Sequence, residues 1–157
     1  MKKICTFGVL GLFLYACSSQ SNDKQEKTRS FAEKPTTSTS SDYDPNRGLG
    51  KFESIELGEQ LDPSLAKTGE TVANLKCASC HKYSEERLVG PGWAGVTSKH
   101  KPEWIMNFIT NPDPMIDQDP ELQTQLEICM VRMPNQNLSD EDARAILEFM
   151  RQNDGVQ

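Results

Sequence analysis

Near its middle the chain reads Cys77-Ala78-Ser79-Cys80-His81. Two thiols lie three residues apart, and an imidazole follows the second thiol directly. At the end of a helix this spacing lets both sulfurs reach one planar ligand and brings the imidazole beneath the centre of that ligand. The C-x-x-C-H pattern is typical of covalent attachment of a c-type haem, and because it occurs once we expect one haem.

Two other interpretations of the same cysteines fit the sequence less well. A redox dithiol of the thioredoxin kind requires a βαβ context, which this sequence lacks. A zinc site requires more ligands than Cys77, Cys80 and His81 with the distant Cys129 or His100 readily supply. The sequence therefore favours the haem hypothesis.

Residues 1–17 have the pattern of an export signal. Lys2 and Lys3 precede a short apolar stretch that is too short to span a bilayer. Its end, Leu14-Tyr15-Ala16-Cys17, resembles the lipobox of bacterial lipoproteins, which implies that Cys17 is lipidated and begins the mature chain. An uncleaved anchor and an ordinary secretory signal are the alternatives. We expect a protein outside the cytoplasm, anchored by lipid to a bacterial membrane and facing the periplasm, where c-type haem is attached.

Residues 18–62 are rich in Ser, Thr and charged residues and poor in apolar ones. Such a segment buries too little apolar surface to offset its chain entropy, so the composition predicts a disordered tether. Packing of Phe52, Ile55 and Leu57 against the domain is the alternative.

Residues 63–157 form the predicted folded domain, which is small enough to lean on a cofactor for stability. Asp62-Pro63 predicts the start of a helix over 63–79, and Pro102 opens a second helix that stops at Asn111-Pro112. A third helix is expected near 118–130, and a fourth begins after Ser139 and runs to Gly155. No alternating strand pattern is present, so the fold class is all-α, with about four helices.

Three separated pieces of this domain carry a resemblance to class I monohaem cytochromes c: the Cys77–His81 pentapeptide, Gly90-Pro91 and Met133-Pro134. The resemblance covers residues 63–157 and implies a helical bundle around one covalently bound haem. It implies that the Pro91 carbonyl accepts a hydrogen bond from His81, the first axial ligand of the iron, and that Met133 is the second.

Other axial ligands remain open on the sequence alone. Met130 lies close enough to replace Met133 after a small shift, and Met115 lies in a Pro-rich stretch that could also approach the iron. His100 would give bis-histidine ligation, but its polar surroundings favour a solvated surface position. A thioether ligand raises the reduction potential relative to a second imidazole.

Several further residues are candidates for the surroundings of the haem. Trp93 and Trp104 are large enough to form its apolar walls, and the Trp104 indole could donate to a propionate. Arg87 could neutralise a propionate or lie on the surface. We expect Cys129 to be a small buried residue, with a free thiol near the haem or a covalent link to a partner as alternatives. The resemblance also implies that Gly69 and Phe149 meet where the first and last helices cross.

The expected function is electron transfer. With 17 Lys+Arg against 23 Asp+Glu the formal charge is −6, which argues against nucleic acid as a partner. Iron with both axial positions filled by protein offers no site to a small-molecule substrate, so we expect a carrier and not an enzyme, working between redox proteins of a respiratory chain. Asn135-Gln136-Asn137-Leu138-Ser139 and Pro102-Glu103-Trp104-Ile105 also resemble small cytochromes linked to nitrous oxide reduction.

Two alternatives belong to other classes. In one, Met133 is labile and the protein is a haem enzyme or gas sensor that binds peroxide, NO or CO. In the other, the chain is a non-redox lipoprotein with a structural metal at Cys77, Cys80 and His81.

Overall fold

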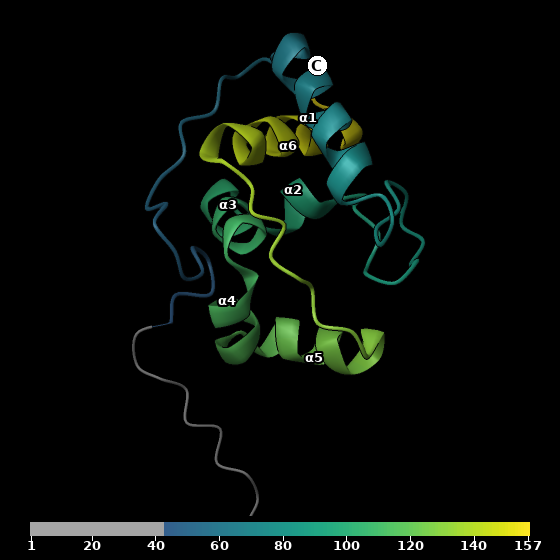
Figure 1. The fold of residues 1–157 in the computed structure, drawn as a ribbon. Helices are drawn as coiled ribbons and strands as arrows, with labels where there is room; N and C mark the ends of the chain where they lie inside the picture. The colour runs from purple at the N-terminus through teal and green to yellow at the C-terminus, as the bar shows by residue number, and fades with distance from the viewer. Residues whose placement is uncertain (1–42) are drawn as a thin grey trace, which may run out of the picture. The chain divides into compact units, whose positions relative to one another are not determined.

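A computed structural model of the chain describes residues 43–157, which contain six α-helices and no strand (Figure 1). The helices are α1 (Pro63–Lys76), α2 (Val96–Lys99), α3 (Pro102–Thr110), α4 (Pro112–Gln118), α5 (Pro120–Cys129) and α6 (Asp140–Asn153). One isolated β-bridge joins His81 and Arg87. The predicted all-α fold class is confirmed.

Prolines and capping side chains set the helix boundaries. The Asp62 carboxylate accepts hydrogen bonds from the backbone N–H groups of Ser64 and Leu65, both at 3.0 Å, and so caps α1. Ser139 caps α6 by accepting from the Asp142 N–H at 3.1 Å. Pro102, Pro112 and Pro120 stand in the first turns of α3, α4 and α5, where the missing N–H costs nothing.

The helices differ from the prediction in number and length. Pro112 not only ends α3 but also begins α4, and residues 96–99 add a single turn, so there are six helices where about four were expected. Helix α1 ends at Lys76, and not at residue 79, because residues 77–80 form a tight turn.

Helices α1 and α6 cross closely (Figure 1). A Cβ atom on Gly69 would lie 1.9 Å from the carbonyl oxygen of Ala145, so only glycine allows this approach. The neighbour of Gly69 is therefore the main chain of α6. Phe149, its expected partner, packs edge-on against Tyr83, with ring centroids 4.9 Å apart.

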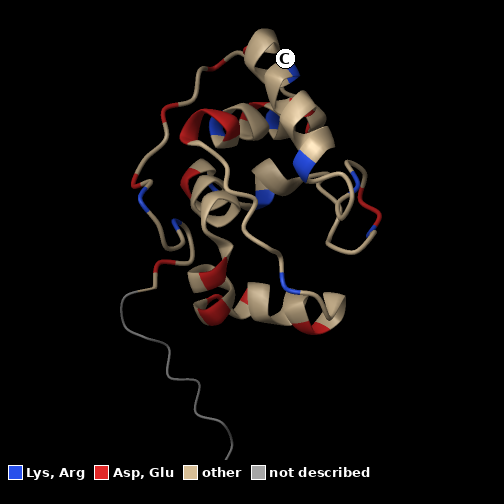
Figure 2. Ribbon diagram, in the orientation of Figure 1, with Lys and Arg blue, Asp and Glu red and all other residues tan. Residues whose placement is uncertain are grey.

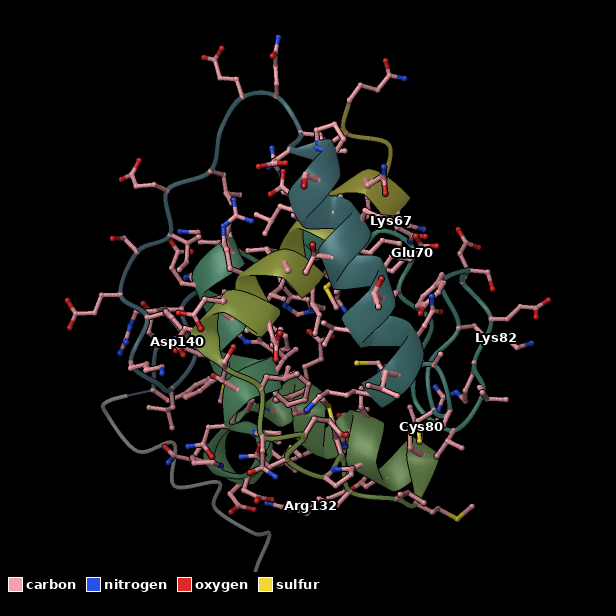
Figure 3. The ribbon with its side chains drawn as sticks, turned by 45° about the horizontal axis from the view of Figure 1, so that its top comes forward. Lys67, Glu70, Cys80, Lys82, Arg132 and Asp140 are labelled. Carbon is pink, nitrogen blue, oxygen red and sulfur yellow. The ribbon has the colours of Figure 1, made fainter. Side chains whose placement is uncertain are left out.

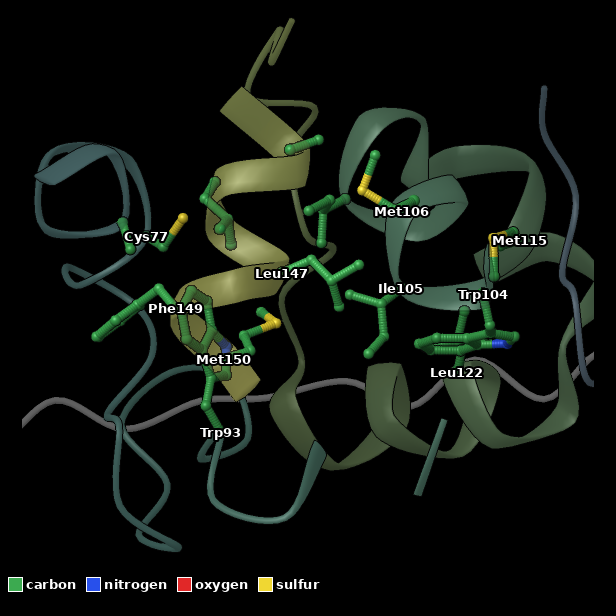
Figure 4. Close-up of a cluster of buried hydrophobic side chains, with 14 of the residues drawn as sticks. Cys77, Trp93, Trp104, Ile105, Met106, Met115, Leu122, Leu147, Phe149 and Met150 are labelled. Carbon is green, nitrogen blue, oxygen red and sulfur yellow. The ribbon is translucent and has the colours of Figure 1, made fainter. Parts of the chain in front are cut away.

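The core is formed mainly by α3 and α6, with contributions from α1, α4 and α5 (Figure 4). In that view Cys77 lies at one side of the cluster, and Trp104 and Leu122 lie at the other. Met106, Met115 and Met150 are all buried there. The core thus extends from the end of α1 to the start of α5, the two elements that border the cavity described below.

The prediction of a disordered tether over 18–62 is wrong for residues 43–62. This segment, called here the N-terminal strap, runs along α3 before it enters α1 (Figure 1). Its apolar side chains Leu49, Phe52, Ile55 and Leu57 pack against the core, as the alternative interpretation allowed for three of them.

Polar side chains of the domain hold the strap in place. The fully buried Asn107 side chain donates to the carbonyls of Arg47 (3.0 Å) and Phe52 (2.9 Å) and accepts from the N–H of Phe52 (2.9 Å). Near the other end, Arg151 donates to the Gly58 carbonyl at 2.8 Å. These partners satisfy backbone groups that a disordered segment would leave to water.

The predictions for residues 1–17 and 18–42, including lipidation of Cys17, lie outside the described residues. Within residues 43–157, no helix is both long enough and apolar enough to cross a membrane.

Candidate functional site

A cavity of about 420 Å³ lies between the turn after α1 and helices α3, α5 and α6. A second, smaller cavity of about 100 Å³ is lined by two residues of the C-x-x-C-H motif, Cys80 and His81. Four of the predicted residues, Cys80, His81, Pro91 and Met133, line both cavities, and Cys77, Trp93 and Trp104 line the larger one. The structure therefore brings all seven residues predicted to contact the haem to one place.

The C-x-x-C-H motif forms a tight turn at the end of α1. The N–H groups of Cys80 and His81 both donate to the Cys77 carbonyl, at 3.0 Å each. This turn sends both sulfurs and the imidazole into the same cavity, and Figure 3 shows Cys80 between the end of α1 and the bottom of the molecule. Both cysteines are free thiols, and burial raises the pKa of the Cys77 thiol to about 11.

The His81 ring is held in one orientation by the Gly90-Pro91 turn. Its Nδ1 lies 2.8 Å from the Pro91 carbonyl oxygen, which can only accept, so Nδ1 carries the proton and the lone pair of Nε2 stays available. A Cβ on Gly90 would lie 2.4 Å from Cε1 of the ring, so glycine is required there. Burial lowers the pKa of His81 below its usual value, which favours the neutral ring that a metal needs.

The two tryptophans form walls of the cavity. Trp93 is 5.6 Å from His81 between ring centroids, and Trp104 is buried on α3. The Trp104 indole N–H donates to the Asp119 carboxylate at 3.2 Å, so its partner is a side chain of the protein and not a propionate. Asp119 also caps α5 and accepts a hydrogen bond from Tyr43 of the strap.

The three methionines considered as axial ligands lie in different surroundings. Met133 lines both cavities from the non-helical segment between α5 and α6. Met115 is fully buried and packs beneath Gly48 of the strap, and Met130 is 86% exposed with a left-handed backbone (φ 56°). Neither Met115 nor Met130 lines either cavity.

Arg87 and Cys129 lie together near the smaller cavity. The Arg87 guanidinium is 3.2 Å from the Cys129 sulfur, and Arg87 lines neither cavity, so the structure gives it no part in the site. Cys129 is half-buried and free, and it lines the smaller cavity with Cys80.

The predicted surface position of His100 is wrong, because its side chain lines the larger cavity. Its side chain is only 13% exposed and stacks on Trp104, with centroids 3.8 Å apart. The spacing of four residues between them hints at such a contact. That hint was obscured because Pro102 starts the helix between them and charged residues surround His100.

The donors around the cavity suit a haem and do not suit zinc. The cavity has the size of a small-molecule site, with two thiols and an imidazole on one side, a thioether near them and apolar walls. In the described part of the chain, no group of three or more His, Cys, Asp or Glu side chains is placed to hold a metal ion. The fold and the site define a helical protein that holds one haem.

Comparisons with known proteins agree with this class. The family model described as Cytochrome c matches residues 66–154. A solved cytochrome c from Rhodothermus marinus is 39% identical, with a TM-score of 0.64, and the match covers 67% of this chain and 90% of that one. An engineered variant of it, Rma TDE, is 38% identical to this chain, with a TM-score of 0.63 and the same covered shares of the two chains. A structure of that variant bound to a carbene intermediate has an identity of 38% and a TM-score of 0.61. No curated protein matches the chain.

The chain belongs to the cytochrome c family, and it is a class I monohaem member. Its cofactor is covalently bound haem c with iron, and its activity is haem-based electron transfer.

Proposed function

We propose that this protein carries single electrons between respiratory complexes outside the cytoplasm, tethered to a membrane by lipid at Cys17. The observation that carries the proposal is the pairing, in one cavity, of an imidazole fixed through its Nδ1 with a methionine thioether. When bound, the haem supplies an iron that gains and loses one electron.

Cys77 and Cys80 would hold the haem. Each thiol would hold the haem through a thioether bond to one of its two vinyl groups. The tight turn supports this role because it brings both sulfurs to the same cavity.

His81 would bind the iron through Nε2. The Pro91 carbonyl holds the proton on Nδ1 and orients the ring, which makes the imidazole a better donor to the metal. Gly90 leaves the space in which the ring sits. The chain thus builds this ligand from the motif turn and one short loop.

Met133 would be the second axial ligand. Of the methionines on α5 and in the segment after it, Met133 alone lines the cavity. Met150 lines the cavity as well, but it stands on α6 beside Phe149, which joins the ring cluster of Tyr83, Trp93 and His81. Its place in the buried core cluster supports wall packing for Met150, so Met133 is the methionine that would bind the iron.

With His81 and Met133 both bound to it, the iron would offer no site to a substrate, so the chain would need only to position the haem, tune its potential and dock its partners. The exposed large apolar side chains support docking near the motif. Leu88 and Val89 follow the motif turn, Ile128 ends α5, and Met130 and Val131 follow it. Val89 and Val131 line the smaller cavity together with Cys80, one of the haem-attaching residues.

We infer that redox partners meet this apolar edge. The nearby charges are mostly paired within the protein: Arg132 with Asp113 and Asp117, and Lys82 with Glu86. Figure 2 shows acidic residues on α4, on α5 and at the start of α6, and others along residues 43–62. Electron transfer should therefore depend only weakly on salt, and a steep loss of rate between 50 and 500 mM salt would contradict an apolar contact.

The donor and acceptor are redox proteins of a respiratory chain, and a terminal reductase such as nitrous oxide reductase is the acceptor that the sequence suggests. The tether hypothesis rests on residues 1–17 and is tested by Cys17→Ser. We expect the wild-type protein in the membrane fraction and the variant in the released fraction. A wild-type protein recovered without membrane would contradict the tether.

Carbon monoxide separates a carrier from a gas-binding protein or a haem enzyme. CO added to the reduced, matured protein should leave the visible spectrum unchanged, because both axial positions are filled. A rapid shift of the Soret band at neutral pH would instead show a labile sixth ligand and overturn the assignment as a simple carrier.

A further inference from the structure

His100 stands in the wall of the large cavity, where the chain passes from α2 to α3. Its ring lies against Trp104 with an interplanar angle of 13°, and little of its side chain reaches solvent. The whole chain has two histidines, and the other one is His81. His100 is therefore the one remaining imidazole, the side chain whose ordinary pKa is nearest neutrality.

Charged groups surround His100 from each element packed against it. Glu121 of α5 places Oε1 3.8 Å from His100 Nε2, and it also pairs with Lys99 of α2. Asp119, ahead of α5, lies behind the stacked Trp104 and accepts from its indole. Lys101 is the exposed neighbour along the chain. Lys99, His100 and Glu121 all line the cavity, so they form its ionisable end away from the cysteines.

We propose that His100 binds a proton when the haem iron is reduced and releases it when the iron is oxidised, so that this protein couples an electron to a proton. The inference rests on the proposed function, since it takes the cavity as the place of the haem.

Charge balance explains the coupling. Reduction brings one electron, and so one negative charge, into a cavity of low dielectric, which favours a positive charge nearby. One proton from solvent then converts the imidazole to imidazolium, whose Nε2–H faces the Glu121 carboxylate. On oxidation the electron and the proton both leave, and no other reactant is needed.

Several groups of the protein shift the pKa of His100, and they act in opposite directions. Burial lowers the pKa of His100, the Glu121 carboxylate raises it, and Lys99 lowers it. Because these effects oppose each other, a change of charge in the adjoining cavity shifts the balance between neutral and protonated His100.

The test is the reduction potential of the matured holoprotein between pH 5 and 9. For the wild type, the potential should fall as pH rises between the His100 pKa values of the oxidised and reduced states. The slope should approach a tenfold change in the reduction equilibrium per pH unit, which is 59 mV for one electron. His100→Phe and His100→Gln should both give a flat profile, and Lys101→Met should behave as the wild type.

A wild-type reduction potential that does not change with pH would overturn the inference. A pH-dependent potential kept in both His100 variants would also overturn it, and would assign the proton to a haem carboxylate. NMR titration of the His100 ring gives an independent check, with a higher pKa expected in the ferrous state. A matured protein without haem would overturn the proposed function itself. A haem with a pH-independent potential would overturn this inference alone.

Discussion

At the scale of single residues, the placement of His81 depends on the lack of a side chain at Gly90. A methyl group at Gly90 would collide with the ring that the Pro91 carbonyl orients. We expect Gly90→Ala to displace His81, weaken its bond to iron and lower the stability of the holoprotein. Absorption and EPR spectra of the ferric protein should show a changed ligand field.

Gly155→Ala is the matched control. Gly155 has a left-handed backbone (φ 92°), lines neither cavity, and has nothing within 4 Å of the position of its added Cβ. This variant should lose about 1 kcal/mol from backbone strain and keep the wild-type haem spectrum. Equal spectra for the two variants would contradict the role given to Gly90.

Met133 is tested by its own replacement. Met133→Ala should lower the reduction potential and open the iron to CO, because the thioether that stabilises ferrous iron is gone. Met130→Ala, at a side chain that is 86% exposed, should change neither property. If Met133→Ala keeps the wild-type spectrum and potential, another residue is the ligand.

Residues close together in the sequence were the easiest to predict. The spacing within Cys77–His81 is enough to bring both cysteines and the histidine together, and the contact with Pro91 was expected from the resemblance to class I cytochromes c. The partner of the Trp104 indole was not predictable in the same way. Asp119 lies 15 residues away and serves as a helix cap at the same time, a double role that no local pattern shows.

At the scale of elements, the N-terminal strap contributes to stability through Asn107. We expect Asn107→Ala to lower the free energy of unfolding by about 1–3 kcal/mol or more, because three hydrogen bonds to strap backbone are lost in a buried place. Urea denaturation of the holoprotein measures the effect. Asn135→Ala removes two hydrogen bonds of an exposed amide, one to the Thr110 carbonyl and one from the Asn137 N–H, and should cost less than about 1 kcal/mol.

Equal losses in the two variants would mean that the strap contributes little to stability.

The ordered strap was not predicted from the sequence, because the composition of the whole segment 18–62 is polar. Its few apolar residues, such as Leu49 and Phe52, gain their burial from grooves of the folded domain, and its backbone finds partners in side chains some 50 to 90 residues distant along the chain. The helix starts marked by caps, by contrast, follow from local sequence, and the starts of α1 after Asp62 and of α6 after Ser139 were predicted correctly.

At the scale of the whole molecule, acid stability should depend on one buried ion-pair cluster. Glu148 is 1% exposed and pairs with Arg144 at 2.7 Å and Arg151 at 2.8 Å. Burial alone would raise the pKa of Glu148, but the Asp62 N–H and the two guanidinium groups outweigh it, so the pKa lies below its ordinary value of 4.5. The stabilisation is complete above that value and is lost as pH falls through the lower, folded-state pKa.

Glu148→Gln should therefore lower the unfolding free energy at pH 7 by about 3–5 kcal/mol and flatten its decline below pH 4.5. Chemical denaturation between pH 3 and 7 gives both values. Glu141→Gln, at an exposed position of the same helix, is the control and should leave the profile unchanged. A wild-type stability that rises on acidification would contradict the direction of the pKa shift.

The whole molecule is organised around one covalent haem, and intact mass with a pyridine haemochrome spectrum tests that claim most directly. The matured protein should carry the mass of one haem per chain and give the spectrum of a haem bound through two thioethers. The double variant Cys77→Ala with Cys80→Ala should lose both. A colourless wild-type protein with the mass of the polypeptide alone would contradict the account.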